Sequence, residues 1–389
     1  MALPSSEIGS RIRRIREELG ISQSQLASAL GADVANVERL EAGSLDPVPG
    51  DFILIAARIF NIDFRLLMST ELDDVEEETR KVFRVLTRPS PTDLLTIRRF
   101  ITLCLNEAEL EVLLGVDRPT LPPGYPPAAM RADLHKHQAT AAARDERRRL
   151  RLDSRPVENI FELLRSQGVR LFRHKLEDSA LSGVTILHPR AGVCILINYD
   201  DDLYRQFFSA AHEYAHVLFD RQQMAEHGCV VSYRYSRDEL VEIRANAFAG
   251  EFLLPADALQ LYDRPRDLDT LSRVVERIAR DYRVNTEPVA IKTREANWIS
   301  QRTLRSFQQR RPVVIRRTDK ADPDIPSDLT PPQVERRTAA VQAGLTSAYL
   351  ELLRRALSTD AITFGRFAEM LDMAPQDAQI FVRESGLAV

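Results

Sequence analysis

The chain has 389 residues, 44% of them hydrophobic, and a formal net charge of −4. This length is enough for two or three domains with ordinary apolar cores, and the small negative charge excludes a general attraction to nucleic acid or to an anionic membrane. Three isolated cysteines argue against a disulfide framework, and there is no apolar run of about 18 residues and no N-terminal signal. The sequence therefore predicts a cytoplasmic protein without a membrane span.

Residues 1–70 have the pattern of five short helices. Apolar residues recur at helical spacing, and a serine and an aspartate are placed to cap two of the helices. The run ISQSQLASALGADVANVERLEAG, followed by LIAARIFNIDFRLLM, resembles the XRE type of helix-turn-helix DNA-binding domain. The resemblance implies that the third helix enters the major groove, where Gln23, Asn36 and Arg39 would contact phosphates or base edges.

The charge of this segment is low for a domain that binds DNA strongly. Residues 1–70 contain seven arginines and no lysine against nine aspartates and glutamates, so few counter-ions would be released from DNA. Two uses of the domain remain open: binding to an operator, or contact with a protein, which includes dimerisation.

Residues 71–117 predict two helices, because apolar residues recur at helical spacing after the acidic run ELDDVEEETR. We expect a helical spacer or a dimerising element, with the acidic run on a solvated helix face. Residues 118–127 contain five prolines and cannot form a helix or a central strand. They are therefore predicted to be a linker between domains.

A domain of residues 128–305 is expected to follow this linker. Three of its segments, VRLFRHK, GVTILHP and VCILINY, are apolar or alternating and are bounded by glycines, which predicts three strands of a small sheet. His174 and His188 lie on or beside these strands without the spacing of metal ligands. We expect both histidines to be structural.

The segment 207–219 contains the strongest chemical pattern in the chain. Its apolar residues predict a mostly buried helix, and the run His212-Glu213-Tyr214-Ala215-His216 places two imidazoles one turn apart on one face. Imidazole nitrogens suit Zn²⁺, and a carboxylate beside them can accept a proton from an attacking water. We therefore predict His212 and His216 as zinc ligands and Glu213 as the general base.

Residues 241–255 predict a second helix, which is expected to supply the third ligand. Glu242 has three competitors nearby, at Asp238, Glu239 and Glu251. At roughly 100° per residue Glu251 falls on the opposite side of the helix, whereas the other two lie nearer its start, so Glu242 is preferred. Asn246, one turn after Glu242, is placed to hydrogen-bond the outer nitrogen of a ligand histidine.

Taken together, CILIN at 194–198, Arg205, AHEYAHVLF and the pattern ExxANxFAxxFLLP at 242–255 resemble the ImmA/IrrE family of zinc metallopeptidases. The three blocks occur in the order found in that family. The resemblance implies a gluzincin-like endopeptidase in which the two histidines and Glu242 bind zinc. It also implies a substrate that is a transcription repressor, whose cleavage releases the genes that it silences.

A transition-state donor is less clearly defined by the sequence. Tyr233, Tyr235 and His227 lie between the two helices, and each is a candidate, although an ordinary loop residue is the preferred interpretation for all three.

The remainder of the chain predicts further helices. Amphipathic segments at 271–282 and 288–300 should complete the peptidase domain, and residues 306–332 predict a flexible linker. Residues 333–389 predict a C-terminal module of three helices, similar to the module that often accompanies XRE and ImmA/IrrE domains. The expected fold class is therefore mainly α, with an α+β peptidase domain that contains the small sheet.

The leading hypothesis is a zinc-dependent endopeptidase that cleaves a partner transcription regulator in a stress or mobile-element response. The expected cofactor is Zn²⁺ and the expected partner is a protein substrate, with DNA and a second copy of the chain as further candidates. One alternative is a DNA-binding regulator whose zinc domain senses a signal or partner without proteolysis. Another is a toxin-like protease that an antitoxin restrains. The complete set of ligands and base favours an enzyme.

Overall fold

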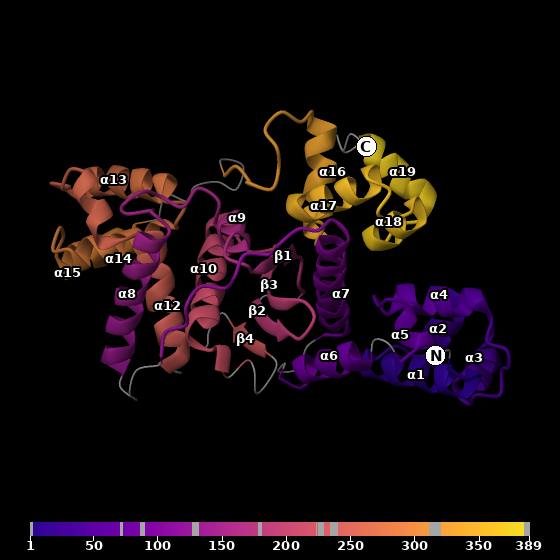
Figure 1. Ribbon diagram of the computed structural model, residues 1–389. Coiled ribbons are helices and arrows are strands. Elements are labelled where there is room, and N and C mark those ends of the chain that lie inside the picture. Colours follow the sequence, from indigo (N-terminus) through magenta and orange to yellow (C-terminus); the bar gives the residue numbers. More distant parts are fainter. Residues whose placement is uncertain are drawn as a thin grey trace.

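The computed structural model describes residues 3–70, 73–85, 90–126, 132–177, 181–222, 224, 229–233, 240–310 and 320–384. A small sheet lies at the centre of the molecule (Figure 1). Helices of the predicted peptidase domain form one end, and the N-terminal domain and the C-terminal helices form the other. Among the described residues, no helix is long and apolar enough to cross a membrane.

The N-terminal domain has the five predicted helices: α1 (Ser5–Glu18), α2 (Gln23–Leu30), α3 (Val34–Glu41), α4 (Gly50–Ile59) and α5 (Arg65–Met68). Ser22 caps α2 through a capping box with Gln25, and Asp33 caps α3 by accepting from the Asn36 backbone N–H. Ser22 thus fixes the start of α2, Asp33 ends the turn between α2 and α3, and the apolar faces of the helices enclose one core.

The sheet has four strands, β1 (Arg170–His174), β2 (Leu181–His188), β3 (Gly192–Asn198) and β4 (Cys229–Tyr233), in the order β1-β3-β2-β4. β1 is parallel to β3, whereas β2 is antiparallel to both of its neighbours. The prediction of three strands was therefore incomplete. β4 was not predicted, and its place in the sheet is defined by its pairing with β2.

The two faces of the sheet pack on different helices. α10 (Leu203–Phe219) covers one face together with α9 (Ile160–Arg165). Val184 and Ile186 of β2 point to the other face, where they join the core formed by α7 (Pro91–Leu113) and the C-terminal helices. Because side chains alternate along a strand, Gly183 and Thr185 face α10. This alternation separates the α10 side of the sheet from the α7 side.

α12 (Leu240–Leu253) packs between α10 and α8 (Ala132–Arg149), and the buried alanines Ala245 and Ala249 allow a close approach. The 3-10 helix η1 (Ala256–Leu261), α13 (Leu268–Asp281), α14 (Thr286–Glu295) and α15 (Gln301–Gln309) complete this core. The helix predicted at 288–300 is present as α14, but it ends earlier than predicted. α14 ends before Asn297, which has a left-handed φ of 57°, and Ser300 caps a separate helix.

The described residues of the C-terminal segment contain the three predicted helices, α17 (Ser347–Ser358), α18 (Phe364–Leu371) and α19 (Pro375–Glu384), and one helix more before them, α16 (Pro331–Gln342). Their core is shared with α7 and the sheet, as the edge-to-face contact of Tyr349 with Phe172 illustrates. Ahead of α16, Asp322 and Asp324 bind the fully buried Arg173 of β1. Of the predicted flexible linker, residues 306–309 belong to α15, and the segment that contains Asp322 and Asp324 is tied to the sheet.

Candidate metal centre

α10 holds its histidines in the interior of the protein. Asp202 caps the helix by accepting from the Tyr204 backbone N–H, and the helix that follows is buried on nearly all sides. His212, Glu213 and His216 are each less than a tenth exposed. Buried polar side chains require hydrogen-bond or metal partners, so the contacts of these three residues indicate their chemical role.

The structure brings His212, His216 and Glu242 together, with one ligand atom from each lying within 4.8 Å of the others. The two Nε2 atoms are 3.1 Å apart, and the Glu242 oxygens lie 3.2 Å from Nε2 of His212 and 3.5 Å from Nε2 of His216. Tetrahedral zinc with bonds of roughly 2.0–2.2 Å separates its ligand atoms by about 3.3 Å. The three residues therefore fit a zinc ion, with one position left for water or substrate.

The electrostatics of the cluster favour positive charge. Burial lowers the pKa of His216, but hydrogen bonds to Asp220 and Glu242 and nearby carboxylate charges outweigh it and raise this pKa to about 10. For Glu242, burial raises the pKa, whereas hydrogen bonds with His212 and His216 outweigh it and lower the value to about 2. Both shifts reflect buried carboxylates in contact with imidazoles, Asp220 and Glu242 in the case of His216, and a divalent cation meets that demand for charge.

The outer nitrogens of both histidines have acceptors. Nδ1 of His212 lies 3.1 Å from Oδ1 of Asn246. This contact was predicted because Asn246 follows Glu242 by one helical turn. Nδ1 of His216 lies 2.8 Å from Oδ2 of Asp220. These contacts orient the two imidazoles with Nε2 toward the cluster.

Asp220 was not predicted from the sequence, although it contacts a histidine of the cluster. Its second oxygen accepts a hydrogen bond from Arg244 of α12, which is 2% exposed and stacks on Phe219. The signal was present in the sequence, because Asp220 follows His216 by four residues and so lies on the same side of the helix. Arg244 had no such signal, since it reaches Asp220 only through the packing of α12 on α10.

The carboxylate of Glu213 lies against β2 of the sheet. Thr185 Oγ1 donates to Glu213 Oε2 at 2.5 Å, and a Cβ on Gly183 would lie 2.5 Å from Glu213 Oε1. β2 therefore needs a glycine at 183 to accommodate the carboxylate. Within the described part of the chain, the buried Oε1 has no hydrogen-bond partner. One oxygen is thus fixed by a hydroxyl, and the other remains able to accept a proton.

The other carboxylates considered as the third ligand are not found at the histidines within the described residues. Glu251 binds Arg144 at 2.9 Å and also Lys292, so it links α12 to α8 and α14 rather than facing the histidines. Asp238 and Glu239 lie outside the described residues.

The candidate transition-state donors are less fully described. Tyr235 and His227 lie outside the described residues, and Tyr233 ends β4 with its side chain outside the description.

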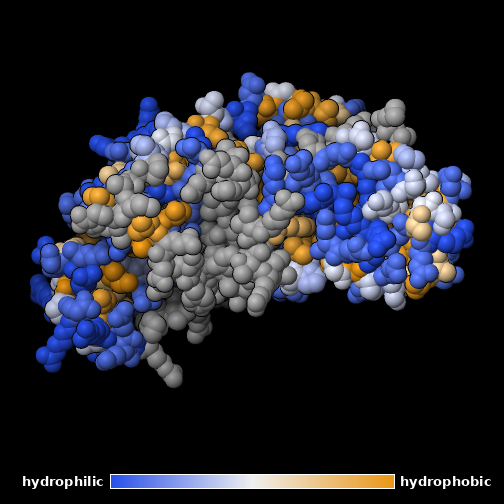
Figure 2. All heavy atoms as spheres, turned by 90° about the horizontal axis from the view of Figure 1, so that it is seen from below, coloured by the Kyte–Doolittle hydropathy of each residue, from blue (hydrophilic) through white to orange (hydrophobic). Residues whose placement is uncertain are grey.

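The three predicted DNA contacts on the N-terminal domain differ in exposure. Gln23 donates to the buried Glu41, which also binds Arg16, so its amide is held against the domain core. Asn36 is partly buried, whereas Arg39 is exposed in the last turn of α3. Seen from below, this end of the molecule, at the right of the view, is mainly hydrophilic (Figure 2).

These features define the class of the protein. A helix-turn-helix domain precedes a small mixed sheet, and two packed helices present the His, His and Glu set typical of H-E-x-x-H metallopeptidases. Residues 164–294 match the Peptidase_M78 family model, described as the IrrE N-terminal-like domain, and residues 7–65 match a helix-turn-helix domain. The chain is therefore a fusion of a helix-turn-helix domain with an IrrE-type domain, which confirms both resemblances. No match to the chain was found among curated proteins.

Proposed function

We propose that this protein is a zinc-dependent endopeptidase. The observation on which the proposal rests is the convergence of His212, His216 and Glu242 beside the buried carboxylate of Glu213. When bound there, zinc would lower the pKa of a water toward about 7 and polarise the carbonyl of the scissile bond.

Residues of the chain would transfer the proton and hold the reacting side chains in position. Glu213 would take the proton of the attacking water and pass it to the nitrogen of the leaving amine, which breaks the peptide bond. Thr185 would hold the other oxygen of Glu213 in place. Asp220 and Asn246 would keep the two imidazoles oriented.

We further propose that the substrate is a transcription regulator. The fusion of a peptidase-family domain with a helix-turn-helix domain supports this assignment, because the second domain belongs to a class found in regulators. In this proposal the N-terminal domain brings the peptidase to the regulator.

The charges of the N-terminal domain favour a protein contact over strong DNA binding. Arg11 and Arg16 are buried in ion pairs with Asp73 and Glu41, and Arg13 pairs with Glu17 on the surface of α1. The buried Arg11 and Arg16 are therefore committed to carboxylates of the chain, whereas the exposed pair of Arg13 contributes little. If the domain binds duplex DNA, few phosphates would be neutralised, and the affinity should fall only weakly with salt.

The experiment that tests the proposal compares wild type with Glu213→Gln in the source cells. Because glutamine removes the base without removing a ligand, the variant should hold its substrate intact, whereas wild type shortens it. The exposed Glu162, replaced by glutamine, is the matched control. Pull-down and mass spectrometry should find one regulator, uncut with Glu213→Gln and cut with wild type and with Glu162→Gln. Identical, unshortened partners with all three proteins would favour a regulator that does not cleave.

A further inference from the structure

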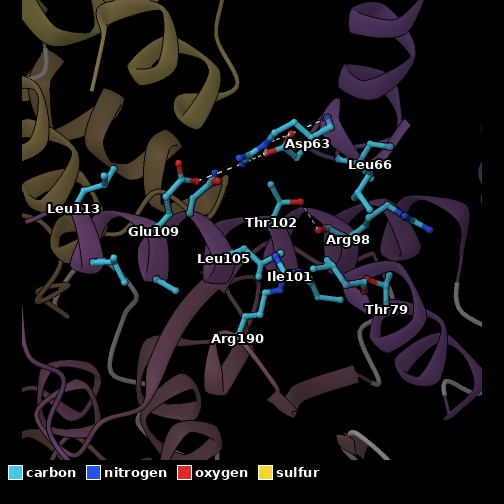
Figure 3. Close-up of a pocket in the computed structure, with 16 residues that line it drawn as sticks. Asp63, Leu66, Thr79, Arg98, Ile101, Thr102, Leu105, Glu109, Leu113 and Arg190 are labelled. Atoms are coloured by element: carbon cyan, nitrogen blue, oxygen red, sulfur yellow. Dashed lines mark hydrogen bonds and ion pairs between the residues drawn. The ribbon is translucent and has the colours of Figure 1, made fainter. Parts of the chain in front are cut away.

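A cavity of about 410 Å³ lies where the N-terminal domain meets α7 (Figure 3). Its walls include α5, α6 (Asp73–Val85) and one long side of α7, and the described residues that line it include none of the candidate metal centre. Two of its charged side chains are paired, because Arg98 binds Glu76 at 2.7 Å and Glu109 binds Arg366 of α18 at 2.7 Å. Glu76 is 4% exposed, so the expectation that the acidic run forms a solvated helix face was wrong for this residue.

A different open space lies on α12, the helix that carries Glu242. A Cβ added to Gly250 would find no atom of the described residues within 4 Å, and Gly250 is partly exposed. Its φ is not in the left-handed region that favours glycine. Glycine is less stable than alanine in the interior of a helix. Neither the backbone nor packing against the described residues therefore requires a glycine at this position.

Gly250 belongs to the exposed side of α12, which passes next to the metal centre. After the first turn of α12, the partly exposed residues follow one another at i, i+3, i+4 and i+7, and they are Ile243, Asn246, Ala247 and Gly250. Asn246 of this row lies 3.1 Å from the ligand histidine His212. The open space at Gly250 is thus one helical turn beyond a residue that contacts the centre.

α10 presents a partly exposed aromatic ring beside the same histidine. Within α10, all of which the structure describes, every residue is buried except Arg205 and Phe208. Arg205 pairs with Asp201 at 3.5 Å. Phe208 precedes His212 by one turn, and the centroids of the two rings are 6.4 Å apart. The ring of Phe208 is therefore an apolar surface next to the metal centre.

The two helices lie side by side and run antiparallel (Figure 1). Phe248 of α12 packs on Phe219 of α10, whereas Phe252, one turn later on α12, packs on Tyr214, which comes earlier on α10. A step forward along α12 therefore corresponds to a step back along α10.

This register brings the open space and the aromatic ring to the same level. Asn246 lies at His212. One turn forward from Asn246 is Gly250, and one turn back from His212 is Phe208. The open space at Gly250 therefore lies across from Phe208, on the exposed sides of the two helices that hold the metal centre.

We propose that the space between Phe208 and Gly250 accepts a large apolar side chain of the substrate, from a residue next to the scissile bond. A substrate bound at the metal centre would lie beside His212, one helical turn of about 5.4 Å from this space. The side chain of a residue next to the scissile bond spans that distance. It would contact the ring of Phe208 and the backbone of α12, which glycine leaves accessible. This inference rests on the proposed peptidase function and adds the kind of residue at which the substrate is cut.

Calorimetric titration of the zinc-loaded full chain with two hydroxamates tests the proposal. Hydroxamates chelate zinc, so acetohydroxamate reports binding to the metal alone, and 3-phenylpropanohydroxamate adds a benzyl group to it. Wild type should bind the phenyl probe about tenfold more tightly, as expected for burial of an aromatic side chain. Binding requires no catalysis, so the comparison is independent of whether a substrate is cleaved.

Two variants test the location of the phenyl group. Gly250→Leu fills the open space and should abolish the preference for the phenyl probe. Phe208→Leu keeps an apolar side chain but removes the ring, and it should reduce the preference about threefold. The matched control is Gly365→Leu, at an exposed glycine of α18 where an added Cβ would lie 3.8 Å from Oγ1 of Thr363. This control should keep the full preference.

The outcomes separate this inference from the proposed function. Equal affinity of wild type for the two probes would overturn the inference and leave the zinc centre intact. A preference that Gly250→Leu retains at wild-type strength would also overturn it. If neither probe bound to wild type, the zinc centre itself would be contradicted, and the proposed function and this inference would fail together.

Discussion

Replacement of Asp220 by asparagine is predicted to weaken zinc binding and, separately, to destabilise the metal-free protein. One oxygen of Asp220 lies 2.8 Å from Nδ1 of His216, and the other binds Arg244, which is 2% exposed. Asparagine has nearly the same shape as aspartate but lacks the charge. The variant therefore removes the electrostatic contribution at both contacts without creating a cavity.

The magnitudes follow from these two contacts. Loss of a carboxylate that orients a ligand histidine costs about 10- to 100-fold in metal affinity, which is about 1.4–2.8 kcal/mol. Loss of the partner of a buried arginine costs about 3–5 kcal/mol of folding free energy. Asn246→Ala is the matched comparison, because it removes the acceptor of His212 but leaves no buried charge unpaired.

Two assays separate the effects. Competition with a chelator measures zinc affinity, and urea unfolding of the metal-free protein can be followed by the fluorescence of Trp298, which packs against the peptidase core. Both variants should lose zinc affinity, but Asp220→Asn alone should lose stability. Wild-type zinc affinity in Asp220→Asn would refute the reasoning.

Three other substitutions test individual contacts. Thr185→Val should lower kcat about tenfold at unchanged zinc content, because the hydroxyl that holds Glu213 is lost. Thr185→Ser keeps the hydroxyl and should retain the wild-type kcat. Equal kcat values for the two variants would count against a positioning role. Glu242→Gln should lower zinc affinity. Glu251→Gln should keep zinc but lower the free energy of unfolding, because Arg144 and Lys292 lose their partner. The opposite pattern would assign the ligand to Glu251. Burial lowers the pKa of His174 from 6.5 to about 4, so its contribution to stability is complete above pH 6.5 and is lost as the pH falls toward 4, by up to about 3 kcal/mol. The difference in unfolding free energy between wild type and His174→Asn should therefore depend on pH across this window, and an NMR titration of His174 with a pKa near 6.5 would contradict it.

The parts of the site that are local in sequence could be predicted. The i and i+4 spacing of His212 and His216 defines one helix face, and helical geometry alone separated Glu242 from Glu251. Asp220 follows the same rule and was overlooked. Helix caps such as Ser22 also predicted the start of an element correctly.

The parts that depend on tertiary packing could not be predicted. Thr185 reaches Glu213 across 28 positions of the chain, and Arg244 reaches Asp220 only because α12 packs on α10. β4 becomes a strand by pairing with β2. The shared core of α7, the sheet and the C-terminal helices likewise has no signature in any single segment, and the cavity at the base of the N-terminal domain exists only through that assembly.

The central claim is that the centre formed by His212, His216 and Glu242 hydrolyses a peptide bond with Glu213 as base. The most direct measurement incubates the regulator captured by Glu213→Gln with purified, zinc-loaded protein and identifies new N-termini by mass spectrometry. We predict one cleavage site with wild type and none with Glu213→Gln at equal zinc content. Cleavage retained by Glu213→Gln, or an intact regulator with zinc-loaded wild type, would contradict the claim.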